Sequence, residues 1–108
     1  MTDEATIVME DNLNQIWNEK DPEVRLKAIE RIYSSTATLN HVGDQVTGFD
    51  AINNSVSATQ KIMSSNFVFT RLKPVIINNS VGRPVASGMD VAHFENGRIK
   101  SLYVFLDN

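Results

Sequence analysis

The sequence of 108 residues contains no cysteine, which excludes disulfide bonds, thiolate metal ligands and a cysteine nucleophile. It also has no excess of basic residues, because 10 lysines and arginines stand against 13 acidic residues and give a net charge of −3. A nucleic acid or an anionic membrane as main partner would require a basic face, so the charge argues against both. No apolar run approaches the length of a membrane span, and the acidic N-terminal residues do not resemble a signal peptide. We therefore expect a cytoplasmic protein with a neutral, hydrophobic or cationic ligand.

Residues that could hold a cofactor are also scarce. The two histidines, His41 and His93, lie in different segments without metal-ligand spacing, and no glycine-rich phosphate loop occurs. The sequence therefore predicts neither a metal nor an organic cofactor. With 42% hydrophobic and 21% charged residues, the composition is typical of a soluble globular protein. At this length we expect residues 1–108 to form one domain.

The strongest structural signal is a hairpin over residues 85–107. Asn96-Gly97 lies between two runs rich in β-branched and aromatic residues, and this dipeptide suits a type I′ turn because both turn residues need positive φ. An uninterrupted register from that turn places Asp90 opposite Tyr103. Small residues flank Asp90 on its face, so the sequence predicts space in front of its carboxyl group.

The same register divides the hairpin into two largely apolar faces. The face of the acid carries Gly88, Asp90, Ala92, Phe94, Ile99, Tyr103 and Phe105. The opposite face carries Met89, Val91, His93, Lys100, Leu102, Val104 and Leu106. Helices can cover only one of them, so we expect a second subunit to bury the opposite face and the protein to be a homodimer.

The rest of the chain alternates helical and strand patterns. Helical periodicity predicts a first helix that ends near residue 19, a second that begins at Pro22 behind the N-cap Asp21 and ends near residue 34, and a third over residues 50–63. The expected strands are those of residues 37–42, 45–47, 67–72 and 73–78, followed by the hairpin. Helices segregated from an antiparallel sheet make an α+β fold.

Five segments in this order resemble the SnoaL-like branch of the NTF2-like superfamily, whose members include polyketide cyclases. They are WNEKDPEVR at residues 17–25, IY at 32–33, GFDAI at 48–52, GMDV at 88–91 and NGRI at 96–99. The resemblance implies an NTF2-like cone in which a curved antiparallel sheet packs on three helices around a hydrophobic pocket. It also implies dimerisation through the outer face of the sheet.

The resemblance also indicates which residues line that pocket. In enzymes of the isomerase and cyclase type, an acid on the strand before the terminal turn lies in the pocket, and the matching residue is Asp90. A second family acid corresponds to Asn40 and His41, and a tyrosine of the first helix corresponds to Leu13. Since neighbouring strand residues face opposite sides, at most one of Asn40 and His41 enters the cavity, and the family position favours Asn40.

These arguments give a set of candidate residues. A carboxyl group in an apolar pocket has a raised pKa and can act as a general acid or base. The catalytic candidates are Asp90, Asn40 and Tyr103. The candidates for binding a flat hydrophobic ligand are Trp17, Tyr33, Phe69, Phe94 and Phe105. For each aromatic residue, plain core packing is the alternative, and an acid that only satisfies the interior is the alternative for Asp90.

Two functions fit this sequence. The first is a cofactor-independent isomerase or cyclase that uses Asp90 for acid/base chemistry on a ketone or polyketide-like substrate. The second is a non-catalytic ligand-binding or dimerisation module, because fold does not fix function. In both, the partner is a small hydrophobic molecule rather than nucleic acid or membrane.

Overall fold

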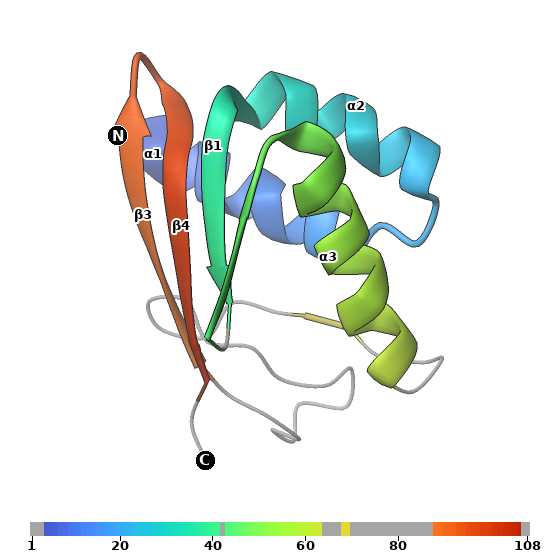
Figure 1. Ribbon diagram of the computed structural model, residues 1–108. Helices are drawn as coiled ribbons and strands as arrows, with labels where there is room; N and C mark the ends of the chain where they lie inside the picture. The colour runs from blue at the N-terminus through green and yellow to red at the C-terminus, as the bar shows by residue number, and fades with distance from the viewer. Residues whose placement is uncertain (1–3, 42, 64–67, 70–87, 107–108) are drawn as a thin grey trace.

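The computed structural model describes residues 4–41, 43–63, 68–69 and 88–106 (Figure 1). Its helical elements are α1 (Glu4–Asp11), the π-helix η1 (Asn12–Trp17), α2 (Pro22–Ile32) and α3 (Phe49–Ile62). Its strands are β1 (Tyr33–His41), β2 (Asp44–Thr47), β3 (Gly88–Glu95) and β4 (Arg98–Leu106). The strands predicted at residues 67–72 and 73–78 lie almost entirely outside the described residues.

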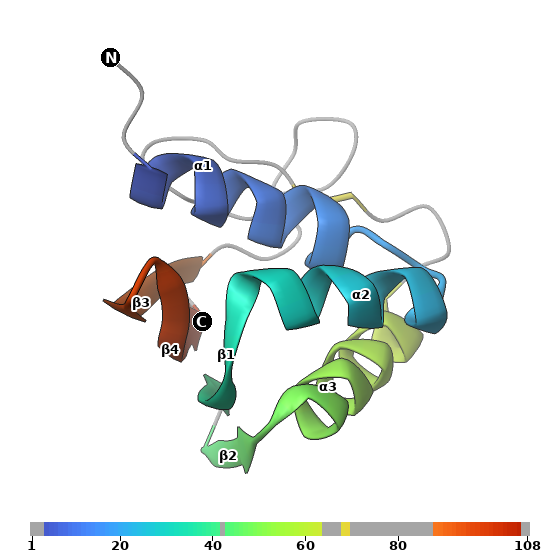
Figure 2. The ribbon, with the colours of Figure 1, turned by 90° about the horizontal axis from the view of Figure 1, so that it is seen from above.

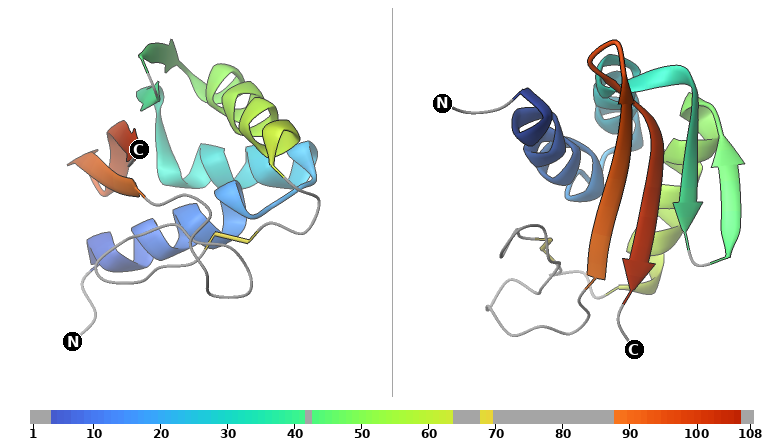
Figure 3. Two further views of the ribbon diagram at one scale, coloured as in Figure 1. Left: turned by 90° about the horizontal axis from the view of Figure 1, so that it is seen from below. Right: turned by 90° about the vertical axis from the view of Figure 1, so that its left-hand side faces the viewer.

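The four described strands form one sheet in the order β2-β1-β4-β3. β1 is antiparallel to β2, and β3 is antiparallel to β4, but β1 and β4 run parallel. Figure 2 shows the strands as a curved row with the helices on its concave side, and Figure 3 shows the hairpin in front of α2 and α3. The predicted α+β class is therefore confirmed, whereas the sheet is mixed rather than antiparallel because β4 returns beside β1 in the same direction.

The first predicted helix is divided into two helical forms. α1 is followed by η1, in which the backbone N–H of Asn18 donates to the carbonyl oxygen of Leu13 at 3.0 Å, five residues back. Such π-turns accommodate an extra residue in a helix. The wider turn brings positions five apart close to one face, so Asn12 and Trp17 can face the same side, and both are buried.

The second helix begins as predicted. The side chain of Asp21 accepts a hydrogen bond from the backbone N–H of Glu23 at 2.9 Å, and Pro22 occupies the first turn. The helix ends at Ile32, two residues before the predicted end near residue 34, and β1 starts at the next residue, Tyr33. This direct connection makes Tyr33 a strand residue with a fully buried side chain.

The hairpin turn is confirmed, but the predicted register holds only next to it. Asn96 and Gly97 both have positive φ, and Phe94 pairs with Ile99 as predicted. His93 then pairs with Ser101, so that Lys100 is an extra residue on β4. Because one extra residue shifts the alternation of a strand, the faces predicted for residues 101–106 are reversed.

The core lies between the helices and the concave face of the sheet. It comprises Leu13, Ile16, Trp17, Ala28, Ile29, Ile32, Tyr33, Ala37, Leu39, Ile52, Val56, Phe69, Ile99, Leu102 and Val104. Leu102 and Val104 belong to it because of the extra residue in β4. None of the described helices is long and apolar enough to cross a membrane.

Candidate functional site

Asp90 lies on the concave face of the sheet, where the sequence predicted it. Its strand partner is Val104, which is buried, and Ala92 on the same face of β3 packs against the core. Tyr103, which the sequence placed opposite Asp90, instead pairs with Val91. The carboxyl group therefore stands among aliphatic side chains rather than beside a phenol from the neighbouring strand.

The carboxyl group of Asp90 is buried and incompletely hydrogen-bonded. Within the described part of the chain, its Oδ1 atom has no hydrogen-bond partner. Burial raises the pKa of Asp90 from 3.8 to about 6, because the charged form loses hydration. At neutral pH the group can accept a proton, and slightly below neutrality it can return one, as a general acid/base requires.

Tyr33 is the aromatic residue most closely coupled to this carboxyl group. Its hydroxyl donates a hydrogen bond of 2.7 Å to Oδ1 of Asn12, so the phenol is anchored to η1. Burial raises the pKa of Tyr33, and the charge of Asp90 raises it further. The phenol thus remains protonated and lies within electrostatic range of Asp90. Asn12 was not predicted as part of the site, because only the π-turn brings it there.

Trp17 borders the same region from the end of η1. Its ring makes edge-to-face contacts with His41 and Phe69, with centroid separations of 5.9 Å and 6.1 Å. The indole N–H approaches the hydroxyl of Tyr33, and this polar contact lowers the pKa of Tyr33. The contact does not have regular hydrogen-bond geometry, and Nε1 of Trp17 has no regular hydrogen bond to any described residue.

His41, not Asn40, is the residue of its strand that faces the interior. It alternates in phase with Leu39, which is buried, and its ring contacts Trp17. Burial lowers the pKa of His41, and nearby Asp44 partly offsets this effect. The prediction that Asn40 enters the cavity and His41 stays outside is therefore wrong in placement, because β1 starts at Tyr33 and keeps Leu39 in the core.

Three predicted site residues lie on the convex face. Tyr103 and Phe105 are 41% and 53% exposed, and Asn40 pairs with Tyr103 across the parallel strands. The extra residue Lys100 accounts for the position of both aromatic residues, since it moves them to the opposite face. Asn40, Tyr103 and Phe105 are thus not grouped with Asp90.

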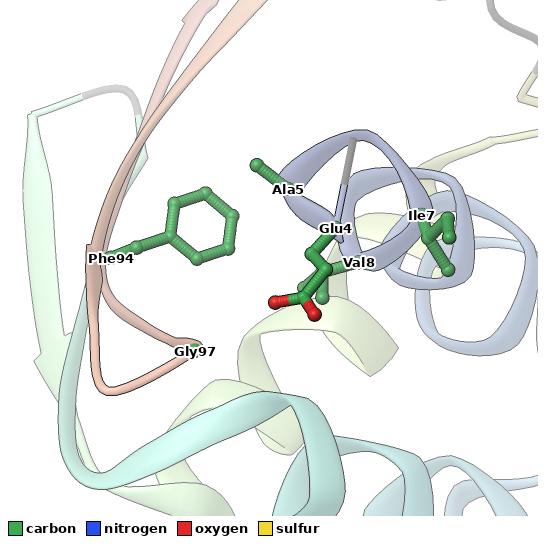
Figure 4. A pocket seen from close by; sticks show the side chains of 6 residues that line it. All are labelled: Glu4, Ala5, Ile7, Val8, Phe94 and Gly97. Carbon is green, nitrogen blue, oxygen red and sulfur yellow. The ribbon is translucent and has the colours of Figure 1, made fainter. Parts of the chain in front are cut away.

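Phe94 lies on the concave face, but four residues along β3 from Asp90. It lines an open groove of about 410 Å³ between the start of α1 and the hairpin turn. Figure 4 shows its ring projecting from β3 toward Ala5, with the carboxylate of Glu4 nearby. Among the described residues that line this groove, Glu4 is the only ionisable one, whereas the region around Asp90 also contains Tyr33 and His41.

A hydrogen-bond network holds the end of η1 in place. Gln60 of α3 donates to the carbonyl oxygens of Trp17 at 3.0 Å and of Glu19 at 2.9 Å. The same side chain accepts a hydrogen bond of 2.9 Å from Arg25, whose guanidinium is fully buried. Phe69, a predicted ligand-binding residue, is held by its backbone: its N–H donates to Oδ1 of Asn18 at 2.7 Å. The rings of Trp17 and Phe69 are therefore fixed relative to α3.

The described side chains form no cluster of three or more histidine and acidic groups suited to a metal ion. The polar groups that the structure brings together on the concave side are the carboxyl of Asp90, the phenol of Tyr33, the indole of Trp17 and the imidazole of His41. They form what we call the interior cluster. The sequence predicted Tyr33 and Trp17 only as aromatic residues that line a hydrophobic pocket. The structure shows in addition that the hydroxyl of Tyr33 and the N–H of Trp17 lie on the same side of the sheet as Asp90.

Comparison with known proteins places this arrangement in a fold. No protein-family model matches the sequence, and no curated protein matches it significantly. Among solved structures, a candidate isomerase of the SnoaL-like family from Agrobacterium tumefaciens has a TM-score of 0.84 at 20% identity, covering 97% of this chain and 98% of its own.

Two further structures are similar over most of their length. A candidate polyketide cyclase from Sinorhizobium meliloti has a TM-score of 0.62 at 15% identity, with 95% of this chain and 99% of that chain covered. A protein with a ketosteroid isomerase-like fold from Catenulispora acidiphila, in complex with trimethylamine, has a TM-score of 0.60 at 13% identity, with 91% and 83% covered. The chain therefore has the fold of NTF2-like proteins, as its sequence motifs predict.

Proposed function

We propose that the protein binds a small hydrophobic ketone or polyketide-like molecule at the interior cluster and isomerises or cyclises it without a cofactor. The observation that carries this proposal is the buried, unpartnered Oδ1 atom of Asp90. A buried polar atom without a partner is costly, and native proteins keep few of them. Such a cost is typical of a site whose partner is a ligand.

The chemistry follows from the raised pKa of Asp90, which is about 6. The carboxylate takes a proton from the carbon next to the ligand's carbonyl group; the electrons of that C–H bond form a C=C bond, and the π electrons of the carbonyl group move to its oxygen to give an enolate. For isomerisation, the carboxylic acid returns the proton to another carbon of the conjugated enolate, and the C=O bond forms again. For cyclisation, the enolate carbon attacks a second carbonyl carbon of the same ligand, and the carboxylic acid gives its proton to the oxygen of that carbonyl. A pKa close to the operating pH suits both steps.

The similarity to solved structures supports the same proposal at the level of substrate class. The similar structures include a candidate isomerase, a candidate polyketide cyclase and a protein bound to a small molecule. A module that binds such a ligand without converting it is the second candidate, since each described polar group of the interior cluster can also serve binding alone.

Exchange of ligand protons with solvent tests the catalytic form of the proposal. We expect the wild-type protein to accelerate exchange of the C1 protons of 2-tetralone in D₂O, measured by NMR, and Asp90→Asn to abolish the acceleration. Glu95→Gln, an exposed acid of the same strand, is the matched control. If 2-tetralone binds but the wild-type rate equals the buffer rate, the ligand-binding module is the better description.

We also propose that the convex face of the sheet forms a homodimer interface. Val91, Tyr103 and Phe105 are all more than two-fifths exposed there, and exposed apolar side chains of neighbouring strands are typical of interaction surfaces. Sedimentation at micromolar concentration tests this: we expect a dimer for the wild type and a monomer for Tyr103→Ser. A wild-type monomer would refute the interface.

A further inference from the structure

The backbone around Trp17 is well hydrogen-bonded, whereas the N–H of its indole ring is not. The backbone around it is fully engaged: Asn18 donates through its N–H to Leu13, and Gln60 donates to the carbonyl oxygen of Trp17 itself. The side chain of Asn18 makes two hydrogen bonds to the backbone of Phe69, at 2.8 Å and 2.7 Å. The indole N–H, on a residue that is 5% exposed, makes no hydrogen bond of regular geometry among the described residues and only approaches the hydroxyl of Tyr33, whose pKa it lowers.

The orientation of the indole is fixed from three sides. Its ring packs edge-to-face on His41 and on Phe69, and its end lies near the hydroxyl of Tyr33. The Tyr33 hydroxyl donates to Asn12, so towards the indole it can act only as an acceptor, and it feels the charge of Asp90. The indole N–H of Trp17 and the carboxyl group of Asp90 therefore both act on one phenol, and neither Nε1 of Trp17 nor Oδ1 of Asp90 has a hydrogen bond of regular geometry in the described chain.

We infer that the indole N–H of Trp17 is the hydrogen-bond donor that the interior cluster offers to the carbonyl oxygen of its ligand. A donor held rigidly and without a hydrogen bond of regular geometry binds an acceptor at little cost in reorganisation, whereas a hydrocarbon of the same shape gives it no better partner. Trp17 thus selects carbonyl compounds over their oxygen-free counterparts. This inference rests on the proposed binding of a ketone but not on its conversion.

The sequence makes the test direct, because Trp17 is the only tryptophan and gives the only indole N–H signal in a ¹⁵N-correlated NMR spectrum. The probes are 2-tetralone and tetralin, which share a skeleton and differ in the carbonyl group. For the wild type, we expect 2-tetralone to bind about tenfold more tightly than tetralin. The ketone should also move the indole proton downfield, and tetralin should move it much less.

Substitution separates the donor from the ring. Trp17→Phe keeps an aromatic ring and removes the N–H, so we expect the preference for 2-tetralone to fall from about tenfold to within about twofold. Ile16→Val is the control for a loosened core, since it removes one buried methyl group from the same turn and should leave the preference unchanged. The wild-type titration stands on its own if Trp17→Phe does not fold.

The possible results distinguish this inference from the proposed catalysis. Carbonyl preference with an indole shift, but without Asp90-dependent proton exchange, supports the donor and rejects catalysis. Proton exchange with an unmoved indole signal and an unchanged preference in Trp17→Phe rejects the donor and leaves catalysis standing. If neither probe perturbs the indole signal of the wild type at millimolar concentration, the inference is wrong.

Discussion

Arg25 and Asp90 are both ionisable residues in the interior, and the protein treats them in opposite ways. The guanidinium of Arg25 donates to Asn53 at 2.5 Å, to the carbonyl oxygen of Glu19 at 2.7 Å, to Gln60 and to Ser57. The carboxyl of Asp90 has one oxygen without any partner in the described chain. A buried charge that is fully hydrogen-bonded stabilises one arrangement of the chain. A buried charged group without all its hydrogen bonds lowers stability, which is typical of a residue that serves function.

The difference extends to the regions around them. Arg25 joins α2, the turn before it and α3 through groups of the chain alone, so its surroundings are complete without a ligand. The interior cluster is not complete in its hydrogen bonds, since within the described chain Oδ1 of Asp90 has no partner and Nε1 of Trp17 has no hydrogen bond of regular geometry. We therefore assign Arg25 to the framework and Asp90 to the function.

Replacing Arg25 should have the largest effect on stability. Arg25→Met removes four hydrogen bonds and leaves buried acceptors of Asn53 and Gln60 unpaired, so we expect a loss of about 3 kcal/mol or more in urea unfolding. Arg31→Met, on the exposed face of the same helix, should cost about 0.5 kcal/mol or less. Equal losses in the two variants would contradict the framework role of Arg25.

Replacing Asp90 should increase the free energy of unfolding, whereas replacing Arg25 should decrease it. The pKa of Asp90 rises from 3.8 to about 6 on folding, so between these values the native state holds a proton that the unfolded state has released. Stability therefore falls as the pH rises through this range, and the cost above it is about 3 kcal/mol, or about 1.36 kcal/mol for each unit of pKa.

Asp90→Asn removes this cost. We expect it to stabilise the protein at pH 8 by up to about 3 kcal/mol and to give almost no gain at pH 4, measured by unfolding at each pH. The native pKa of His41, lowered by burial, acts in the other direction and reduces wild-type stability on acidification. Comparison with His41→Gln separates the two. A destabilised Asp90→Asn at pH 8 would show that the carboxylate is a structural acceptor after all.

Within the interior cluster, replacing Tyr33 tests whether the phenol or burial determines the pKa of Asp90. Its hydroxyl donates to Asn12, so Tyr33→Phe leaves a buried amide oxygen unpaired, and we expect a loss of about 1–2 kcal/mol. The pKa of Asp90 should change little, because burial is the cause of its shift. A pKa of Asp90 that returns to about 4 in Tyr33→Phe would show that the phenol is its main determinant.

The smallest effect on the stability of the monomer is expected on the convex face. Tyr103 is 41% exposed and pairs with Val91, away from the core. At protein concentrations low enough for the wild type to be monomeric, Tyr103→Ser should change the free energy of unfolding by about 0.5 kcal/mol or less. It should also leave the affinity for 2-tetralone unchanged, measured by calorimetry. A tenfold loss of affinity would show that Tyr103 contacts the ligand, contrary to the convex position that the strand register gives it.

Local signals in the sequence predict much of the framework. Asn96-Gly97 fixes a turn because few other residues accept positive φ at both positions, and Asp21-Pro22 fixes a helix start through the capping hydrogen bonds. The position of Asp90 on the concave face also follows from its strand. Each of these features depends on a few adjacent residues.

The errors come from single inserted residues whose cause is tertiary. Lys100 adds a residue to β4, and the π-turn of η1 changes which positions share a face. Neither has a distinctive residue type, because both are stabilised by packing of distant segments rather than by local propensity. As a result, Tyr103 was expected beside Asp90. Asn40 was expected there from the family position, whereas the structure brings Trp17, Tyr33 and His41 to that side of the sheet.

The most direct test of this account is the pKa of Asp90 itself, measured by NMR titration of its carboxyl carbon in the ligand-free protein. We predict a value near 6, and a change in this value when 2-tetralone is present, because a ligand next to the carboxyl alters its surroundings. A value near 4 that the ketone does not alter would mean that the carboxyl is hydrated or hydrogen-bonded in solution, and would contradict the functional role assigned to it.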